Sequence, residues 1–177
     1  MKQKIQIRCK NNKKSQKVEI GSTLFDVFSS FDLKMTHGPV SARVNNKVEG
    51  MHYRVYNSKD VEFLDMNSAS GSRAYTRTLF FVLCKAVQDI YPNTDVVIDI
   101  PVSNGFYVDI RLGRPVVDED VNILRRRMQE IIDSKMPIRR FTVPTEEAIA
   151  LFQEKGDVEK VKLLRTSGSI YTTYYKI

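Results

Sequence analysis

The side chains best suited to metal binding or nucleophilic catalysis are few in this sequence. It contains two cysteines, Cys9 and Cys84, and two histidines, His37 and His52. None of the four has the spacing of a zinc site. Cys84 falls in an apolar run, where a free cysteine behaves as a small hydrophobe, and Cys9 has no histidine near it in sequence. We therefore expect no metal site and assign no catalytic residue.

A cluster of cations at the beginning of the chain suits an anionic partner. The first 17 residues contain no acid and seven bases, namely Lys2, Lys4, Arg8, Lys10, Lys13, Lys14 and Lys17. The rest of the chain has 21 basic and 21 acidic side chains, so the formal net charge of +7 comes from this segment. Because neutralised phosphates release counterions, the cluster predicts contacts to RNA or tRNA. The alternative is a solvated hairpin whose lysines keep an exposed strand edge from pairing.

Composition indicates a folded protein without a membrane segment. Of the 177 residues, 42% are hydrophobic, which is enough for an ordinary core. The longest apolar run, 79–84, is far shorter than the ~20 residues of a membrane-spanning helix. The amino terminus is rich in lysine and has no apolar signal core. We expect a cytoplasmic protein with no membrane partner.

The elements that must position the cations form the first part of the chain. Alternating stretches at 5–9 and 17–20, around a polar turn, predict a β-hairpin. Ser22 or Thr23 can cap a helix with apolar positions from 24 to 31. Strands are expected at 40–44 and 61–64. This order of elements is typical of a β-grasp.

A polar segment divides the chain. Residues 67–72 read Asn-Ser-Ala-Ser-Gly-Ser, a composition typical of a linker, so we expect domains at 1–66 and 73–177. The second domain is predicted to contain a hairpin (96–100 and 106–112), a strand (141–143) and a final β-rich segment. Helices are expected over 79–90 and 158–164, from residue 118 onward, and directly after Thr145, which is expected to be an N-cap. The whole chain is therefore expected to be α+β. The β-rich end has no closing turn, so we expect this domain to continue beyond residue 177.

The second hairpin carries a polar face. Alternation places Tyr107, Asp109 and Arg111 on one side, where they can line a cleft beside Arg77. Alternatively, Asp109 and Arg111 pair with each other on an exposed sheet face. The triplet 125–127, Arg-Arg-Arg, is interpreted as a solvated helix face whose arginines pair with nearby acids, rather than as an RNA-contacting ridge.

The order of motifs resembles the amino-terminal region of threonyl-tRNA synthetases. Residues 104–109 read Asn-Gly-Phe-Tyr-Val-Asp, close to the family's Asn-Gly-Phe-Tyr-Tyr-Asp, and 145–148 read Thr-Glu-Glu-Ala. The part from Ser70 onward is similar to the second additional domain of those enzymes, and the part before it is similar to a TGS domain. The resemblance implies a β-grasp domain followed by an α+β domain like those that edit mischarged tRNA.

The resemblance also implies that the editing site is degenerate. In that family the helix before the hairpin carries His-x-x-x-His, whose imidazoles converge on a zinc ion or on the ester being edited. Matching Leu83, Ala86 and Val87 to that helix puts Arg77 and Phe81 at the histidine positions. The candidate ligand cleft then consists of Arg77, Phe81, Tyr107, Asp109 and Arg111.

The chain further resembles the amino-terminal half of Bacteroidetes-type uridine kinases, in which similar domains precede a P-loop kinase domain. The matching segments are 44–50, 54–56, 59–65, 127–132 and 167–175. Phosphoryl transfer requires a G-x-x-x-x-G-K-[ST] loop, and none occurs in these residues. The resemblance therefore implies no cofactor in this segment, and ATP with magnesium only in a downstream kinase domain.

Three functions stay open. The preferred hypothesis is a non-catalytic accessory module of a uridine kinase, with RNA or a small anionic ligand as partner, in which Arg77 meets a phosphate or carboxylate. The second is the editing and tRNA-binding region of an enzyme like threonyl-tRNA synthetase. The third is a structural dimerisation or docking module, and the sequence does not indicate an oligomeric state.

Overall fold

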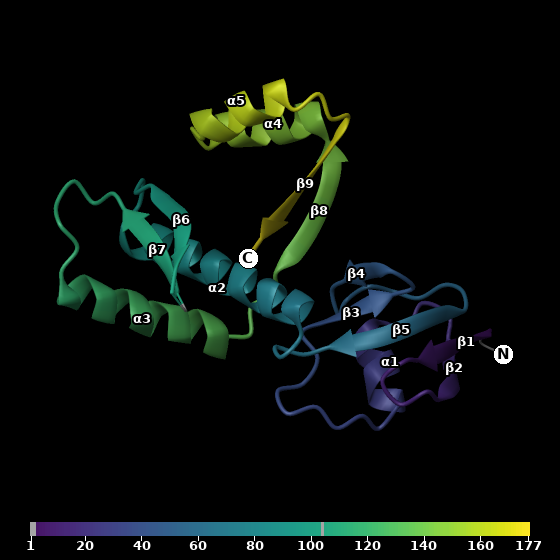
Figure 1. The fold of residues 1–177 in the computed structure, drawn as a ribbon. Coiled ribbons are helices and arrows are strands. Elements are labelled where there is room, and N and C mark those ends of the chain that lie inside the picture. The colour runs from purple at the N-terminus through teal and green to yellow at the C-terminus, as the bar shows by residue number, and fades with distance from the viewer. Residues whose placement is uncertain (1–2, 104) are drawn as a thin grey trace. The chain divides into compact units, whose positions relative to one another are not determined.

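A computed structural model describes residues 3–103 and 105–177 (Figure 1). The chain contains mostly antiparallel sheets together with five helices among the described residues, so the predicted α+β class is confirmed. The chain divides into two compact units, Met1–Cys84 and Lys85–Ile177. No helix in the described residues combines the length and the apolar character needed to cross a membrane.

The first unit contains the β-grasp that the sequence predicts. Its sheet has the strand order β2-β1-β5-β3-β4, in which β1 pairs parallel to β5 and the other neighbours are antiparallel. The short strand β4 was not predicted, because its three residues are exposed or half-buried and show no apolar alternation. The elements are β1 (Lys4–Cys9), β2 (Ser15–Glu19), α1 (Leu24–Ser30), β3 (Ser41–Val44), β4 (Lys47–Glu49) and β5 (Lys59–Leu64).

Helix α1 begins at the predicted cap. The Thr23 hydroxyl accepts a hydrogen bond from the Asp26 N–H at 3.2 Å, and the Asp26 carboxylate accepts one from the Thr23 N–H at 2.8 Å. This capping box satisfies two backbone donors that a helix end otherwise leaves without partners. Leu24 and Val27 then lie fully buried against the sheet.

The segment expected to be a linker is mostly helical. Helix α2 (Ala69–Ile90) includes four of its six residues. The Ser68 hydroxyl accepts a hydrogen bond from the Gly71 N–H at 3.0 Å and donates one to the Asp65 carbonyl at 2.9 Å. The small polar residues therefore start a helix, because serine satisfies its first orphan N–H groups.

The second unit contains two antiparallel ribbons and the remaining helices. Strands β6 and β7 form one ribbon, with an irregularity between Ile98 and Pro101, and β8 and β9 form the other. The predicted helices and strands are present with shifted ends. They are β6 (Val96–Val102), β7 (Gly105–Ile110), α3 (Asp118–Asp133), β8 (Arg139–Pro144), α4 (Thr145–Glu154), α5 (Val158–Thr166) and β9 (Tyr171–Lys176).

The expectation that Thr145 caps α4 is wrong. The cap position is Pro144, and Thr145 is the first helical residue. Its buried hydroxyl lies 2.6 Å from the Ser169 carbonyl, to which it donates, and 3.0 Å from the Thr172 hydroxyl. Because β8 runs directly into α4, this side chain faces the segment leading into β9 instead of the helix end.

Candidate nucleic-acid interface

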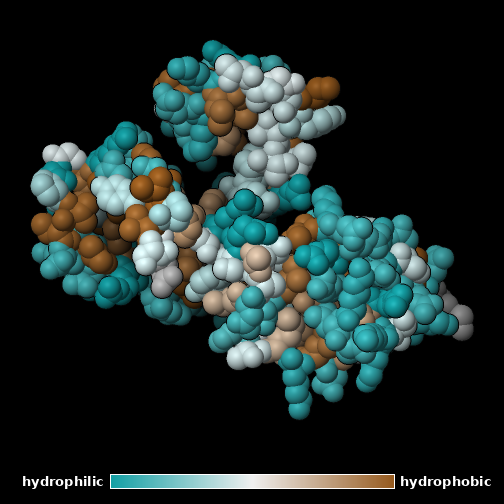
Figure 2. Space-filling view, in the orientation of Figure 1, coloured by the Kyte–Doolittle hydropathy of each residue, from teal (hydrophilic) through white to brown (hydrophobic). Residues whose placement is uncertain are grey.

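The basic cluster lies on the β1–β2 hairpin and its turn. Lys4 and Arg8 are on β1, Lys17 is on β2, and the turn carries Lys10, Lys13 and Lys14; all six are exposed. Lys2 lies outside the described residues. Figure 2 shows that the visible surface of this unit is mostly hydrophilic.

Strand alternation separates the cations from the core. Ile7 and Cys9 are fully buried, whereas Arg8 between them points to solvent. The register places Gln6 opposite Lys17 and Arg8 opposite Ser15. Because directly opposite residues share a face, Lys4, Arg8 and Lys17 lie on one solvent-facing surface of the sheet.

The lysine-rich turn is held in place by Asn11. The Asn11 side chain donates a hydrogen bond to the Phe63 carbonyl at 2.9 Å and accepts one from the Phe63 N–H at 2.8 Å. The Lys10 N–H also bonds the Val61 carbonyl on β5, at 2.8 Å. This role of Asn11 was not predicted from the sequence. The one local signal is the side-chain amide, which can donate to and accept from a backbone as a neighbouring strand does.

The six described hairpin cations have no acidic partner among the described residues, unlike a cation elsewhere on the same sheet. Arg43 on β3 contacts Glu62 on β5 at 2.6 Å. None of the six described hairpin cations forms an ion pair within residues 3–103 and 105–177. Their charges are therefore available to an external anion.

A hollow of about 320 Å³ lies beside Arg8. Its lining residues include Arg8, Lys59, Ser15, Ser58 and Asp60. The parallel register brings Lys59 beside the hairpin, because it pairs Ile7 with Lys59 and Arg8 with Asp60. Because paired residues share a face, Asp60 lies on the solvent-facing surface of Arg8, whereas Lys59 has the face of the buried Ile7.

The residues of the predicted ligand cleft are divided between the two units. Arg77 and Phe81 lie on α2 in the first unit, where Arg77 is exposed and forms no ion pair with a described residue. Tyr107 and Asp109 lie on β7, and Arg111 follows that strand in the second unit. The cleft as a whole stays a prediction.

At the end of β7, Asp109 pairs with Arg111, which follows the strand. The Arg111 Nε lies 3.2 Å from the Asp109 carboxylate, and both side chains are about half exposed. This is the arrangement expected of a surface pair. Tyr107 on the same strand is 58% exposed and so offers an open aromatic surface.

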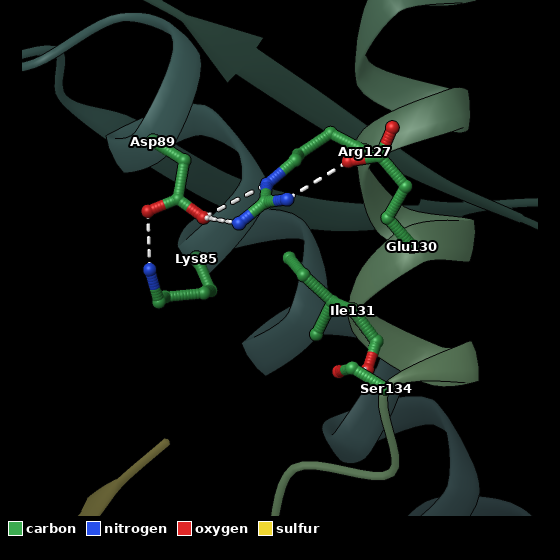
Figure 3. A network of polar contacts seen from close by, with 6 residues as sticks. All are labelled: Lys85, Asp89, Arg127, Glu130, Ile131 and Ser134. Atoms are coloured by element: carbon green, nitrogen blue, oxygen red, sulfur yellow. Dashed lines mark hydrogen bonds and ion pairs between the residues drawn. The ribbon is translucent and has the colours of Figure 1, made fainter.

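Arg127, one of the three consecutive arginines, is held by acids as expected. It donates to Asp89 at 2.8 Å and to Glu130 at 2.8 Å, and Asp89 also accepts from Lys85 (Figure 3). Hydrogen bonding by Lys85 and Arg127 keeps the pKa of Asp89 below its usual value, although partial burial opposes this. Arg125 and Arg126 are exposed.

The cysteines and histidines do not gather at a common site. Cys9 belongs to the core of the first unit, and the His52 and Phe25 rings lie edge to face with their centroids 5.2 Å apart. Among the described residues, no three His, Cys, Asp or Glu side chains come together as metal ligands would.

No protein-family model matches the chain, but curated relatives do. It is 30% identical to the threonine–tRNA ligase of Acetivibrio thermocellus over 145 residues, which cover 82% of this chain and 23% of the ligase. For the ligase of Clostridium kluyveri the identity is 28% over 161 residues, or 91% and 25% of the two chains. For that of Methylococcus capsulatus it is 26% over 154 residues, or 86% and 24%.

The chain therefore spans about a quarter of the length of these relatives. The similarity confirms the resemblance to threonyl-tRNA synthetases and gives no support to the resemblance to uridine kinases. Over most of its residues, the chain is homologous to a part of threonine–tRNA ligases.

Proposed function

We propose that this chain is a tRNA-binding module and that the β1–β2 hairpin is its principal contact surface. The observation that carries the proposal is the set of six exposed hairpin cations without an acidic partner among the described residues. The similarity to ligases that act on tRNA supports tRNA as the anionic partner. It favours this function over the kinase accessory module preferred from the sequence.

The hairpin suits contacts to phosphates rather than to base edges. Five of its six described cations are lysines, which act as flexible point charges, and Arg8 adds one guanidinium. Phosphate contacts fix position and orientation but carry no sequence information. Because Asn11 holds the turn on β5, the turn loses less conformational entropy when it binds RNA.

The proposed module binds without hydrolysing. The resemblance places Arg77 and Phe81 where the synthetases have imidazoles, and neither side chain exchanges a proton near neutral pH or ligates zinc as imidazole does. Arg77 is exposed on α2 and can hold a phosphate oxygen. Its part in the proposal is therefore to bind an anion.

The test measures affinity for a tRNA acceptor stem by fluorescence anisotropy over about 50–200 mM salt. The test variant reverses four hairpin lysines: Lys10→Glu, Lys13→Glu, Lys14→Glu and Lys17→Glu. The control variant makes the same change in charge at exposed residues outside the hairpin: Lys34→Glu, Arg125→Glu, Arg126→Glu and Lys162→Glu.

We expect the affinity of the hairpin variant to fall at least ~10-fold, and its salt dependence to weaken by about 0.7–0.9 in slope for each phosphate that it no longer neutralises. The affinity of the control variant should fall less, and its slope should stay unchanged. Equal affinity of the hairpin variant and the unmodified chain, or equal losses of affinity in the two variants, would contradict the proposal.

A further inference from the structure

The β8–β9 ribbon of the second unit has one covered face and one open face. On the covered face, Tyr174 stacks on Phe141 with ring centroids 5.4 Å apart and contacts Phe152 of α4 edge to face at 6.0 Å. Thr172, on the same face, meets the buried Thr145 hydroxyl. These contacts fix the ribbon to α4.

The open face displays two tyrosines. The register pairs Arg140 with Tyr175, Thr142 with Thr173, and Pro144 with Tyr171, and paired residues share a face. Tyr171 is 64% exposed and Tyr175 is 55% exposed. Tyr175 lies four positions after Tyr171 on the strand, a distance of about 13 Å at ~3.3 Å per residue. Their spacing is set by the strand and not by flexible loops.

The centre of this open face is rigid. The Thr142 and Thr173 hydroxyls hydrogen-bond each other across the ribbon at 2.9 Å. In Figure 1 the two strands lie side by side, and β8 leads directly into α4. A tyrosine has only a few rotatable bonds, so rings presented from paired strands bind with little loss of entropy.

The charge on the ribbon is entirely positive. Its two strands carry Arg139, Arg140 and Lys176 and no acid. Arg139 and Lys176 are cross-strand partners, so two like charges face each other, an arrangement that destabilises a sheet. None of the three forms an ion pair with a residue that the structure describes. By the same register, Arg139 and Lys176 share the covered face with Phe141 and Tyr174, so Arg140 is the cation beside the two exposed tyrosines.

We propose that the β8–β9 ribbon binds single-stranded RNA, with bases stacked on Tyr171 and Tyr175 and a backbone phosphate held by Arg140, which shares their face. Stacking on aromatic rings beside cationic side chains is how proteins bind single strands without reading their sequence. A base pair in a duplex does not expose its faces, so the ribbon selects unpaired nucleotides. This inference extends the proposed function, since it rests on RNA as the partner, but it concerns a second surface.

The test uses the full chain and two RNA probes, a fluorescent oligouridine of roughly 12 nucleotides and a duplex of similar length. The variant Tyr171→Ala/Tyr175→Ala removes both rings. The matched control, Tyr171→Phe/Tyr175→Phe, keeps the rings and removes only the hydroxyls. Urea unfolding of each variant shows whether it is folded.

We expect the oligouridine affinity of the alanine variant to fall about 5-fold or more for each ring removed, and the phenylalanine variant to bind nearly as the unmodified chain does. Duplex binding should change little in both. The hairpin variant with four lysines reversed should show the opposite preference, with a larger loss of duplex binding than of oligouridine binding. A failed hairpin prediction and a failed ribbon prediction are therefore distinguishable.

Equal oligouridine affinities of the alanine and phenylalanine variants would overturn the proposal. A second result would also overturn it: the unmodified chain has a mass that rises with concentration, and the alanine variant loses this behaviour but still binds RNA. The open face would then bind a second copy of the chain. If the alanine variant does not fold, Arg140→Gln serves instead. That variant must weaken oligouridine binding and its salt dependence, and unchanged values overturn the proposal.

Discussion

The Tyr91 hydroxyl donates a hydrogen bond of 2.6 Å to the buried carboxylate of Asp120 and so joins the end of α2 to the first turn of α3. Asp120 also accepts two bonds from the Arg114 guanidinium, both 2.7 Å, and one from the Val117 N–H at 3.0 Å. These donors, Arg114 foremost, hold the pKa of Asp120 well below its usual range. One carboxylate thus fixes three segments of the second unit.

Replacing Asp120 with Asn should lower the free energy of unfolding at neutral pH. It should also make that free energy fall less steeply as the pH becomes acidic. A carboxyl with a lowered folded-state pKa contributes stability above its unfolded pKa of about 3.9 and loses that contribution as the pH falls toward the folded value. The difference between Asp120→Asn and the unmodified chain should therefore be largest near pH 7 and shrink below about pH 4. Urea midpoints measured across this range test it.

Asp118→Asn is the control for this measurement, because Asp118 is in the same first turn but exposed. It should change the urea midpoint much less than Asp120→Asn does. Parallel stability curves for Asp120→Asn and the unmodified chain would show that the carboxylate does not titrate as the hydrogen bonds require.

Tyr91 should ionise at higher pH than an ordinary tyrosine. The hydrogen bond to Asp120 and the nearby negative charge both raise the pKa of Tyr91. Ultraviolet absorbance during alkaline titration should show a late component that disappears in Tyr91→Phe. The stability that this hydroxyl contributes is present below its unfolded pKa and is lost as the pH rises through the raised value. A titration identical in the two proteins would contradict the hydrogen bond.

Asn11→Ala should destabilise the first unit and loosen the basic turn. The change leaves the N–H and carbonyl of Phe63 without the partners they have in the fold, at a cost of about 1–3 kcal/mol. Urea unfolding measures the loss of stability, and Asn57→Ala in an exposed connection is the control. If the turn is also less ordered, RNA affinity should fall although no cation has changed. Equal stability of the two variants would show that the Asn11 pairing is energetically unimportant.

Features that depend on neighbours in sequence were predictable. The hairpin alternation around Ile7, the cap at Thr23 and the cation cluster are visible locally, and the structure has the first two in place. The order of helices and strands in the second unit was also predictable from the spacing of its apolar residues. These predictions succeeded because one element and its termini carry the whole signal.

Features that depend on distant partners were not predictable. Asn11 and Phe63 are separated by 52 positions, and Tyr91 and Asp120 by 29. The same limit explains the error at Thr145, whose hydroxyl finds Ser169 instead of its own helix. The open face of the β8–β9 ribbon likewise follows from the pairing register, which the separate strand sequences do not specify.

Gly71→Ala should be strongly destabilising although Gly71 lies in a helix. A Cβ at this position would lie 1.8 Å from the Asp65 carbonyl oxygen, so the backbone must move. Overpacking of this kind costs about 1–3 kcal/mol, which exceeds the gain from the better helix propensity of alanine. Thermal unfolding measures the effect. Ser72→Ala, the next and exposed position, should be neutral or slightly stabilising, and equal melting temperatures for the two variants would exclude the steric clash.

Asp89 should couple energetically to Arg127 but not to Arg126. Arg127 donates two hydrogen bonds to the Asp89 carboxylate, at 2.8 and 3.0 Å, whereas the neighbouring Arg126 is exposed and is not among the donors to that carboxylate. A double-mutant cycle with Asp89→Asn and Arg127→Gln should be non-additive, and the cycle with Arg126→Gln should be additive. Urea unfolding of the unmodified chain, the three single variants and the two double variants provides both cycles.

Two conditions separate an ion pair from a packing effect in these cycles. The coupling should weaken at high salt, because both side chains are partly exposed and their attraction is screened. It should also fall as the pH drops through the lowered pKa of Asp89, since the protonated carboxyl no longer attracts the guanidinium. A coupling independent of both salt and pH would mean that Asp89 and Arg127 act through the packing of α2 against α3 and not through charge.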